Sequence, residues 1–210
     1  MILSNSKKFI FIKTRKCGGT SIQNTLRPFC KIGDVVSKGF FQNAITNIKC
    51  SLDEFATLED VVKSLDVNPD KYFKFGFARN PFSITLSRYL YQIKMGRVQE
   101  TPSKDNFNRW AKSSYFVPKG QFIYLVDGTR HMLFDKEGTE IVDFIGKLEN
   151  IAIDFEYIKE KLNLDKNIQI KKDNVSNIKK IHYSDWMNEE TRLLVEQHFA
   201  FELKHFRYEY

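Results

Sequence analysis

Hydrophobic residues follow two different patterns along this 210-residue chain. Short apolar runs rich in aromatic and β-branched residues predict strands, and spaced apolar positions predict helices. Residues 9–12 are apolar throughout, which is typical of a central strand that is buried on both faces. Further strands are predicted at residues 72–78, 143–148 and 168–170.

Capping residues mark where the predicted helices begin. Thr20 is expected to cap a helix that ends at Pro28. Spaced apolar positions predict a helix at residues 58–65. Further helices are predicted at residues 81–95, 155–162 and 189–199, with Asn80, Asp154 and Asn188 as their respective caps. Residues 97–119 are polar and are expected to form a loop with one helical turn near Trp110.

The alternation of strands and helices predicts an α/β fold with a mainly parallel sheet flanked by helices. Ligands of such sheets bind beyond the carboxyl ends of the strands. Residues 13–21 follow the first predicted strand directly, and Arg79 follows the second. We therefore expect these two segments to share a ligand.

Composition and charge narrow the class of protein. Hydrophobic residues make up 42% of the chain, which is typical of a single globular domain. The net charge is +7, but 26 acidic residues accompany 33 basic ones without a long run of like charge, so no nucleic-acid surface is expected. No signal peptide or membrane-spanning apolar stretch is apparent, so a cytoplasmic protein without stable membrane insertion is expected. Cys17, Cys30 and Cys50 lack metal-ligand spacing and are expected to be reduced thiols.

The segment at residues 13–21 carries the features of an anion-binding loop. Gly18 and Gly19 let the backbone approach an anion closely at the start of a helix, where free N–H groups point outward. Hydroxyl groups and basic side chains surround them, from Thr20, Ser21, Lys13, Arg15 and Lys16. The loop is not a Walker A motif, because its Lys16 precedes the two glycines instead of following them.

The order Lys-Cys-Gly-Gly-Thr-Ser at residues 16–21, directly after a strand, resembles the 5′-phosphosulfate loop of sulfotransferases. In carbohydrate sulfotransferases this loop commonly reads Lys-Thr-Gly-Gly-Thr-Ser, so only Cys17 departs from it. Arg79-Asn80-Pro81, followed by Ser87 and Tyr89, resembles the 3′-phosphate signature of the same family. Residues 145–149, 174–176 and 202–208 resemble three further family segments, so the likeness extends over most of the chain.

This resemblance implies a single sulfotransferase domain at residues 1–210 with a P-loop-like three-layer fold. It implies in-line transfer of a sulfuryl group from 3′-phosphoadenosine-5′-phosphosulfate (PAPS) to a hydroxyl group, without a metal. Lys16 is expected at the leaving phosphate oxygen, where a pre-placed cation stabilises developing charge. The residues implied in donor binding are Arg15, Lys16, Cys17, Gly18, Gly19, Thr20, Ser21, Arg79, Ser87, Asn174 and Ser176. The motif variants favour a carbohydrate as the acceptor, within the wider class of hydroxyl-bearing small molecules.

The general base that takes the acceptor proton is less clear from the sequence. Many relatives place a histidine between the two motifs, but no histidine lies between residues 28 and 78. Some glycan sulfotransferases use a glutamate, which makes Glu54 and Glu59 the candidates here, with Asp60 beside them. A solvated helix face or a helix cap is the competing interpretation of each carboxylate. His131 and His182 are weaker candidates.

Two other functions remain open at this point. A nucleotide or small-molecule kinase would need a Walker A lysine and a carboxylate for Mg²⁺ at a strand end. A non-catalytic relative that binds a nucleotide or glycan would explain the missing histidine. The acceptor site is expected to involve residues 31–69 and 97–119. Trp110 and Tyr115 could stack on sugar rings there, and packing in the core is an equally good interpretation of both. Basic residues at 171–172 and 179–180 would suit an anionic glycan, although a solvated loop is the default interpretation of them.

Overall fold

The computed structural model describes residues 1–37, 52–115, 129–171 and 181–210. The chain forms two compact units, which we describe one at a time. The first unit contains residues 1–78 and 131–175, and the second contains residues 79–130 and 176–210. The expected single sulfotransferase domain at residues 1–210 stays a prediction.

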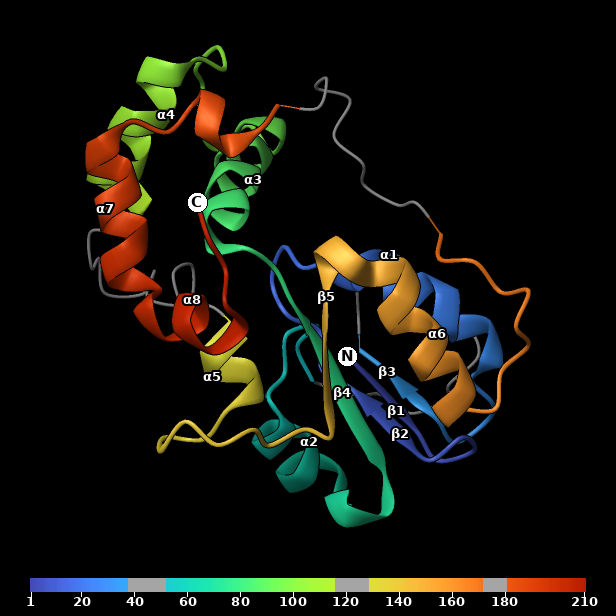
Figure 1. Ribbon diagram of the computed structural model, residues 1–210. Helices are drawn as coiled ribbons and strands as arrows, with labels where there is room; N and C mark the ends of the chain where they lie inside the picture. Colours follow the sequence, from blue (N-terminus) through green and yellow to red (C-terminus); the bar gives the residue numbers. More distant parts are fainter. Residues whose placement is uncertain (38–51, 116–128, 172–180) are drawn as a thin grey trace. The chain divides into compact units, whose positions relative to one another are not determined.

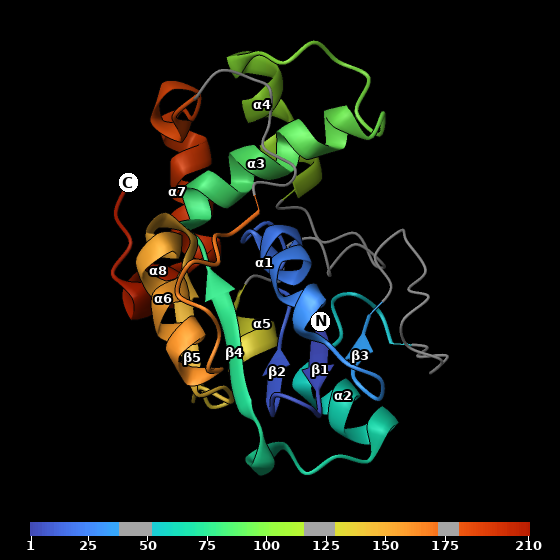
Figure 2. The ribbon, with the colours of Figure 1, turned by 90° about the vertical axis from the view of Figure 1, so that its right-hand side faces the viewer.

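The first unit is built on a five-stranded sheet with the order β3-β1-β2-β4-β5 (Figures 1 and 2). Its strands are β1 (Ile2–Ser4), β2 (Phe9–Phe11), β3 (Val35–Val36), β4 (Phe73–Ala78) and β5 (Phe144–Lys147). β2, β4 and β5 pair in parallel, whereas β1 is antiparallel to both of its neighbours. Four of the five strands therefore share one direction, so the sheet is mostly but not entirely parallel. The P-loop-like arrangement stays a prediction.

Aromatic side chains from the two central strands form the core of this sheet. Phe9 pairs with Phe73, and Phe11 with Phe75, in the parallel register of β2 and β4. The Phe75 ring lies 5.9 Å from that of Phe9 and 5.2 Å from that of Phe11, measured between centroids. β2 is buried along its whole length, as its continuous apolar run predicted.

The helices of the first unit surround this sheet. They are α1 (Gly19–Leu26), α2 (Leu58–Leu65) and α6 (Ile151–Lys161), with 3₁₀ turns at Arg27–Phe29, Pro69–Lys71 and Leu148–Asn150. The predicted bounds of the helix at residues 58–65 are confirmed, and its start is set by a capping box between Thr57 and Asp60. The short helix α5 (Thr129–Leu133) lies in sequence at the boundary between the two units.

The second unit is helical. Its elements are α3 (Pro81–Lys94), α4 (Lys104–Trp110), a π-helical turn at Ala111–Tyr115, a 3₁₀ turn at Tyr183–Asp185, α7 (Glu189–His198) and α8 (Ala200–Phe206) (Figure 1). Phe82, Tyr89, Phe107 and Phe199 pack in one buried cluster between these helices. Asn80 caps α3 by accepting a hydrogen bond from the Phe82 amide, as the sequence predicted.

Two predicted helix starts and one predicted strand were wrong. α1 begins at Gly19 with Gly18 before it, not after a Thr20 cap, because the left-handed Gly18 starts the helix two residues earlier. α6 begins at Ile151, and Asp154 lies inside its first turn. Residues 168–170 form no strand; there the Ile168 carbonyl accepts a hydrogen bond from the buried Lys159 ammonium at 3.1 Å.

Candidate active site

The loop between β2 and α1 begins at the carboxyl end of the central strand. The Ile12 amide still donates to the Phe75 carbonyl at 2.9 Å, which extends the pairing with β4 by one step. The Thr14 hydroxyl donates to the Phe77 carbonyl at 2.5 Å. Lys13 and Thr14 are both buried. The first half of the loop is therefore anchored to β4 before the chain turns into the helix.

The turn into α1 depends on left-handed backbone at two positions. Lys16 has a φ of 62° and Gly18 a φ of 75°. A side chain at Gly18 would also place its Cβ 2.7 Å from Leu148 Cδ1, and one at Gly19 would lie 2.6 Å from Lys13 Cγ. The two glycines therefore permit both the backbone turn and the close packing around it.

The start of α1 has the properties of an anion site. Within the part of the chain that the structure describes, no side chain caps this helix, and its first turn contains no acidic residue. The first N–H groups of a helix lack partners within the helix, and they carry the positive end of its dipole. Thr20 and Ser21 lie in this turn and are half-buried. The geometry therefore suits a phosphate or sulfate group.

Two of the basic residues in the loop are held by the segment Asp53–Phe55. The Lys13 ammonium forms an ion pair with the Glu54 carboxylate at 2.6 Å, and the Lys13 side chain is only 6% exposed. The Arg15 guanidinium lies 3.9 Å from the centroid of the Phe55 ring. Burial lowers the pKa of Arg15, and the charges of Asp53 and Glu54 oppose that shift. The charge of Lys13 is therefore neutralised by Glu54, whereas the Arg15 guanidinium is stacked on the Phe55 ring.

Cys17 is a packing residue in this loop. Its side chain is buried, and its thiol donates to the Arg15 carbonyl at 3.3 Å. The thiol therefore fills space inside the loop.

The structure separates the candidates for the general base. Glu54 lies at the loop through its ion pair with Lys13. Glu59 is 73% exposed on α2 and pairs with Lys63 at 2.5 Å, and this hydrogen bond lowers the pKa of Glu59. Asp60 accepts hydrogen bonds from the backbone and hydroxyl of Thr57 in the capping box. Of these three carboxylates, Glu54 is the one that the fold brings to the loop.

The second motif lies at the start of α3, in the helical unit. Arg79 follows the last residue of β4, and its guanidinium donates to the Ser83 hydroxyl from Nε at 3.0 Å and from Nη2 at 2.7 Å. Ser83 and Ser87 are four residues apart and share a helix face. The sequence prediction included Ser87 but missed Ser83, although its spacing of four residues from Arg79 was a usable signal.

Other predicted residues fall elsewhere. Asn174 and Ser176 lie outside the described residues. Trp110 is 9% exposed and belongs to the core of the helical unit. The His182 ring shares a hydrogen bond of 2.6 Å with the Ser184 hydroxyl. The expectation that the two motifs share a ligand stays a prediction.

The loop and the uncapped helix start lie at the carboxyl end of a central strand in an α/β sheet, an arrangement that suits an anion. The sequence model of the sulfotransferase family matches residues 1–209. The chain therefore belongs to the sulfotransferase family. It is also similar to an uncharacterized protein of Archaeoglobus fulgidus, with 28% identity over 102 residues, which is 49% of this chain and 77% of the relative. No solved structure matches the chain.

Two further features can be stated of the residues that the structure describes. Among them, no group of three or more His, Cys, Asp or Glu side chains is arranged to hold a metal ion. None of the helices in the described ranges combines the length and the apolar character that crossing a membrane requires.

Proposed function

We propose that this protein transfers a sulfuryl group from PAPS to a hydroxyl group of a carbohydrate acceptor. The observation that carries the proposal is the uncapped start of α1 behind the left-handed Gly18, in a chain that belongs to the sulfotransferase family. An open helix start with nearby cations and hydroxyl groups fits the 5′-phosphate end of such a donor. PAPS supplies the sulfuryl group when it is bound.

Some residues of the loop bind the 5′-phosphate, and another stabilises the charge of the leaving group. The backbone from Cys17 to Gly19, with the hydroxyl groups of Thr20 and Ser21, holds the 5′-phosphate. Arg15, oriented by its stacking on Phe55, adds a guanidinium to the same anion. Lys16 stabilises the negative charge that develops on the leaving phosphate oxygen, a role for which one donor is worth about 3–4 kcal/mol.

The second motif distinguishes this donor from ATP. Arg79 and Ser87 bind the 3′-phosphate, and Asn174 and Ser176 add contacts to the nucleotide. The hydrogen bonds from two nitrogens of Arg79 to Ser83 support this assignment, because they restrict the guanidinium at the start of α3. A restricted guanidinium loses less conformational freedom when it binds a phosphate.

Glu54 is our choice for the general base, ahead of Glu59. Its carboxylate accepts the acceptor proton while the acceptor oxygen forms a bond to sulfur and the bond from sulfur to the phosphate oxygen breaks. The ion pair with Lys13 supports this choice, because it holds the carboxylate beside the loop. Glu59 instead pairs with Lys63 on an exposed helix face.

Ligand binding tests the donor. Adenosine 3′,5′-bisphosphate at about 100 times its Kd should stabilise the protein by about 2.7 kcal/mol, which raises Tm by about 5–10 °C for a chain of this size. Mg-ATP at the same concentration should leave Tm nearly unchanged. Stabilisation by Mg-ATP alone would overturn the proposal and favour a kinase.

Turnover tests the residue roles. With labelled PAPS and a glycan panel, Lys16→Ala should lose about 10²–10³-fold in kcat while it still binds the bisphosphate. Lys63→Ala is the matched control, because this lysine is exposed on α2, and it should keep full activity. Glu54→Gln should lose turnover, whereas Glu59→Gln should retain it. Equal activity of the two glutamine variants would refute the choice of Glu54.

A further inference from the structure

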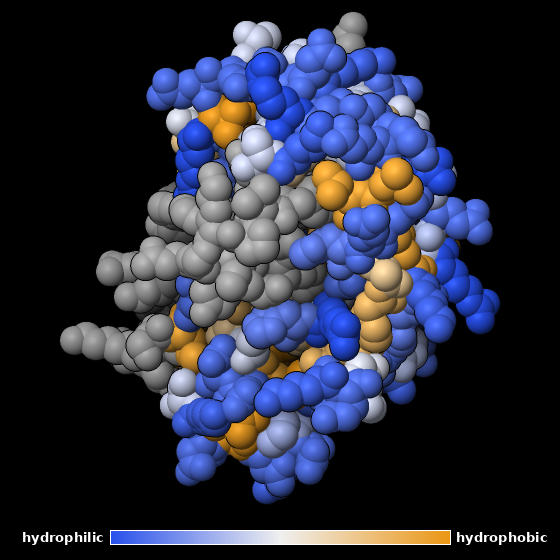
Figure 3. All heavy atoms as spheres, turned by 90° about the vertical axis from the view of Figure 1, so that its left-hand side faces the viewer, coloured by the Kyte–Doolittle hydropathy of each residue, from blue (hydrophilic) through white to orange (hydrophobic). Residues whose placement is uncertain are grey.

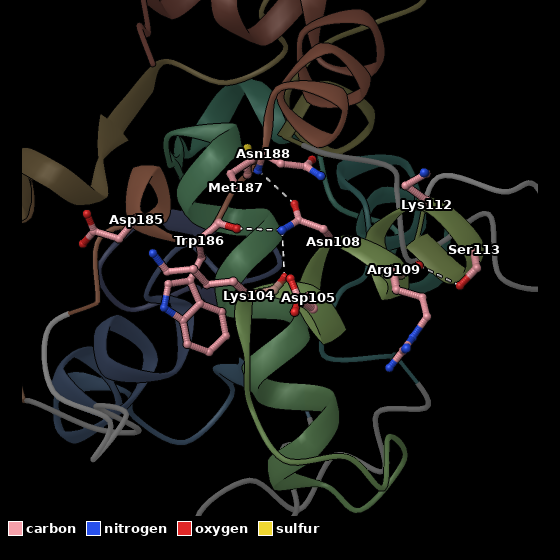
Figure 4. A pocket seen from close by; sticks show the side chains of 10 residues that line it. All are labelled: Lys104, Asp105, Asn108, Arg109, Lys112, Ser113, Asp185, Trp186, Met187 and Asn188. Atoms are coloured by element: carbon pink, nitrogen blue, oxygen red, sulfur yellow. Dashed lines mark hydrogen bonds between the residues drawn. The ribbon is translucent and has the colours of Figure 1, made fainter.

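The helical unit contains a pocket that the donor motifs do not use. It has a volume of about 600 Å³ and lies between α4 with its π-helical extension and residues 185–188 (Figure 4). This volume is within the range of about 300–1,000 Å³ that is common for small-molecule sites. The surface over α4, at the top of Figure 3, is predominantly hydrophilic.

One buried side chain fixes the frame of the pocket. Asn108 is 8% exposed, and its amide nitrogen donates to the carbonyls of Lys104 at 2.7 Å and Trp186 at 2.8 Å. Its amide oxygen accepts from the Asn188 backbone at 3.0 Å. These hydrogen bonds join α4 to the segment before α7, so the two walls of the pocket are held together before any ligand binds (Figure 4).

An aromatic ring forms part of the lining. Trp186 is half-buried, and its ring lies 6.3 Å from the rings of both Tyr89 and Phe107, measured between centroids. This backing restricts the indole while part of it lines the pocket. A restricted, half-exposed indole offers a flat apolar surface at little cost in conformational entropy. Trp110, for which the sequence left both stacking on a sugar and core packing open, is in the core.

Charge in the pocket is close to balanced. Two of its basic residues already have acidic partners outside the lining. The Lys112 ammonium pairs with Glu190 at 2.7 Å, and the Arg109 guanidinium with Glu100 at 3.5 Å. A polyanionic glycan would need an excess of positive charge in the pocket. These two ion pairs neutralise that excess.

The other charged residues of the lining are one lysine and two aspartates, Lys104, Asp105 and Asp185. The lysine offers hydrogen-bond donors, and the two aspartates offer acceptors. The hydroxyl groups of a sugar also donate and accept, and the C–H face of a sugar ring packs on an aromatic ring. This combination fits an uncharged sugar better than a uronate or a sulfated residue.

We propose that this pocket binds a neutral sugar unit, with Trp186 as its stacking surface. The proposal rests on the proposed function only where it identifies this sugar as part of the acceptor. The binding itself does not depend on sulfuryl transfer, and it can be measured without the donor.

The two tryptophans of the chain allow a direct test. In the ¹⁵N-labelled full-length protein, Trp110 and Trp186 give separate indole N–H signals, and Trp186→Phe assigns them. Titration with lactose and with N,N′-diacetylchitobiose should shift the Trp186 signal saturably and leave that of Trp110 in place. A disaccharide that contains a uronate should bind at least tenfold more weakly.

Variants separate stacking from a general loss of structure. Trp186→Leu should weaken binding of the better neutral disaccharide at least tenfold, and Trp186→Phe should keep part of the affinity because it retains a ring. Leu193→Ala is the control, since this side chain is exposed on α7 and does not line the pocket. It should bind as the unmodified protein does.

The outcomes distinguish this inference from the proposed function. An unmoved Trp186 signal with both neutral sugars, or tighter binding of the uronate, would overturn the inference even if adenosine 3′,5′-bisphosphate binds and sulfate is transferred. A shifted Trp186 signal that Trp186→Leu abolishes would support the pocket even if the bisphosphate fails to bind. That second result would refute the proposed donor and leave the sugar site standing.

Discussion

Replacement of Gly19 by alanine tests the packing at the centre of the candidate site. Gly19 is the first residue of α1, and a Cβ there would lie 2.6 Å from Lys13 Cγ and 3.4 Å from Lys13 Cδ and Cε. The Lys13 side chain has little room to move, because it is 6% exposed and its ammonium pairs with Glu54 at 2.6 Å. The added methyl group must therefore displace the lysine stem.

The expected effect follows from two opposing terms. Overpacking of a well-packed site costs about 1–3 kcal/mol. Replacement of glycine by alanine in a helix stabilises the folded state by up to about 1 kcal/mol. We therefore expect Gly19→Ala to lower the free energy of unfolding by about 1–2 kcal/mol and Tm by about 2–8 °C. In a Lys13→Ala background the clash is gone, so the same change should be neutral or stabilise by up to about 1 kcal/mol.

Urea unfolding of the four proteins in this cycle measures the coupling, which should be about 2 kcal/mol. Gly33→Ala is the control in both backgrounds. Gly33 has a φ of 92° and open space around its Cβ position, so its replacement should cost the same whether or not Lys13 is present. If Gly19→Ala is equally destabilising with and without the lysine side chain, the contact between Gly19 and Lys13 is not the reason that a glycine is needed.

Three further predictions concern other parts of the chain. Burial, reinforced by the charge of Asp34, raises the pKa of the Cys30 thiol to about 12. Between about pH 9 and 12 the thiol therefore stays protonated in the folded protein, whereas it ionises in the unfolded chain. Its contribution to stability should therefore fall between about pH 9 and 12, and a Cys30→Ser variant, followed by urea unfolding, should lack this part of the pH dependence. Asn80→Ala should cost about 1–2 kcal/mol in urea unfolding, because it removes the cap of α3 and a hydrogen bond of 3.0 Å to a carbonyl near the C-terminus, and an unchanged midpoint would refute this role. Gly146→Ala should lower Tm, because its Cβ would lie 2.5 Å from the buried Phe77 ring, and a calorimetric Tm equal to that of the unmodified protein would contradict the close contact.

Elements with a strong local pattern were predictable. The helix at residues 58–65 was found because its apolar positions show helical spacing within one short segment. β4 was found from its dense aromatic run, and the start of α3 from its Asn80 cap followed by Pro81. Both signals are local. β1 and β3 were missed, since they are as short as two or three residues and lack a continuous apolar run like the one at residues 9–12 that marked β2. They are ordered by pairing with each other and with β2, which is a property of the sheet.

The candidate site divides in a similar way. The glycines, hydroxyls and basic residues at residues 13–21 are neighbours in the chain, so the sequence indicated an anion-binding loop without any knowledge of the fold. It could not show that Lys13 is buried against Glu54, because those two residues are 41 positions apart. Nor could it show that Arg15 is stacked on Phe55.

By itself, the sequence predicted an anion-binding loop, and it contained the motifs of the sulfotransferase family and the helices whose caps are local. Only the tertiary structure decided which carboxylate meets the loop and which tryptophan lines a pocket. Glu54 and Glu59 were both candidates in the sequence, and Trp186 was not singled out there at all. The physical reason is that backbone preferences and caps act over about four residues. Burial and side-chain pairing instead depend on which segments, distant in the sequence, come into contact in the folded protein.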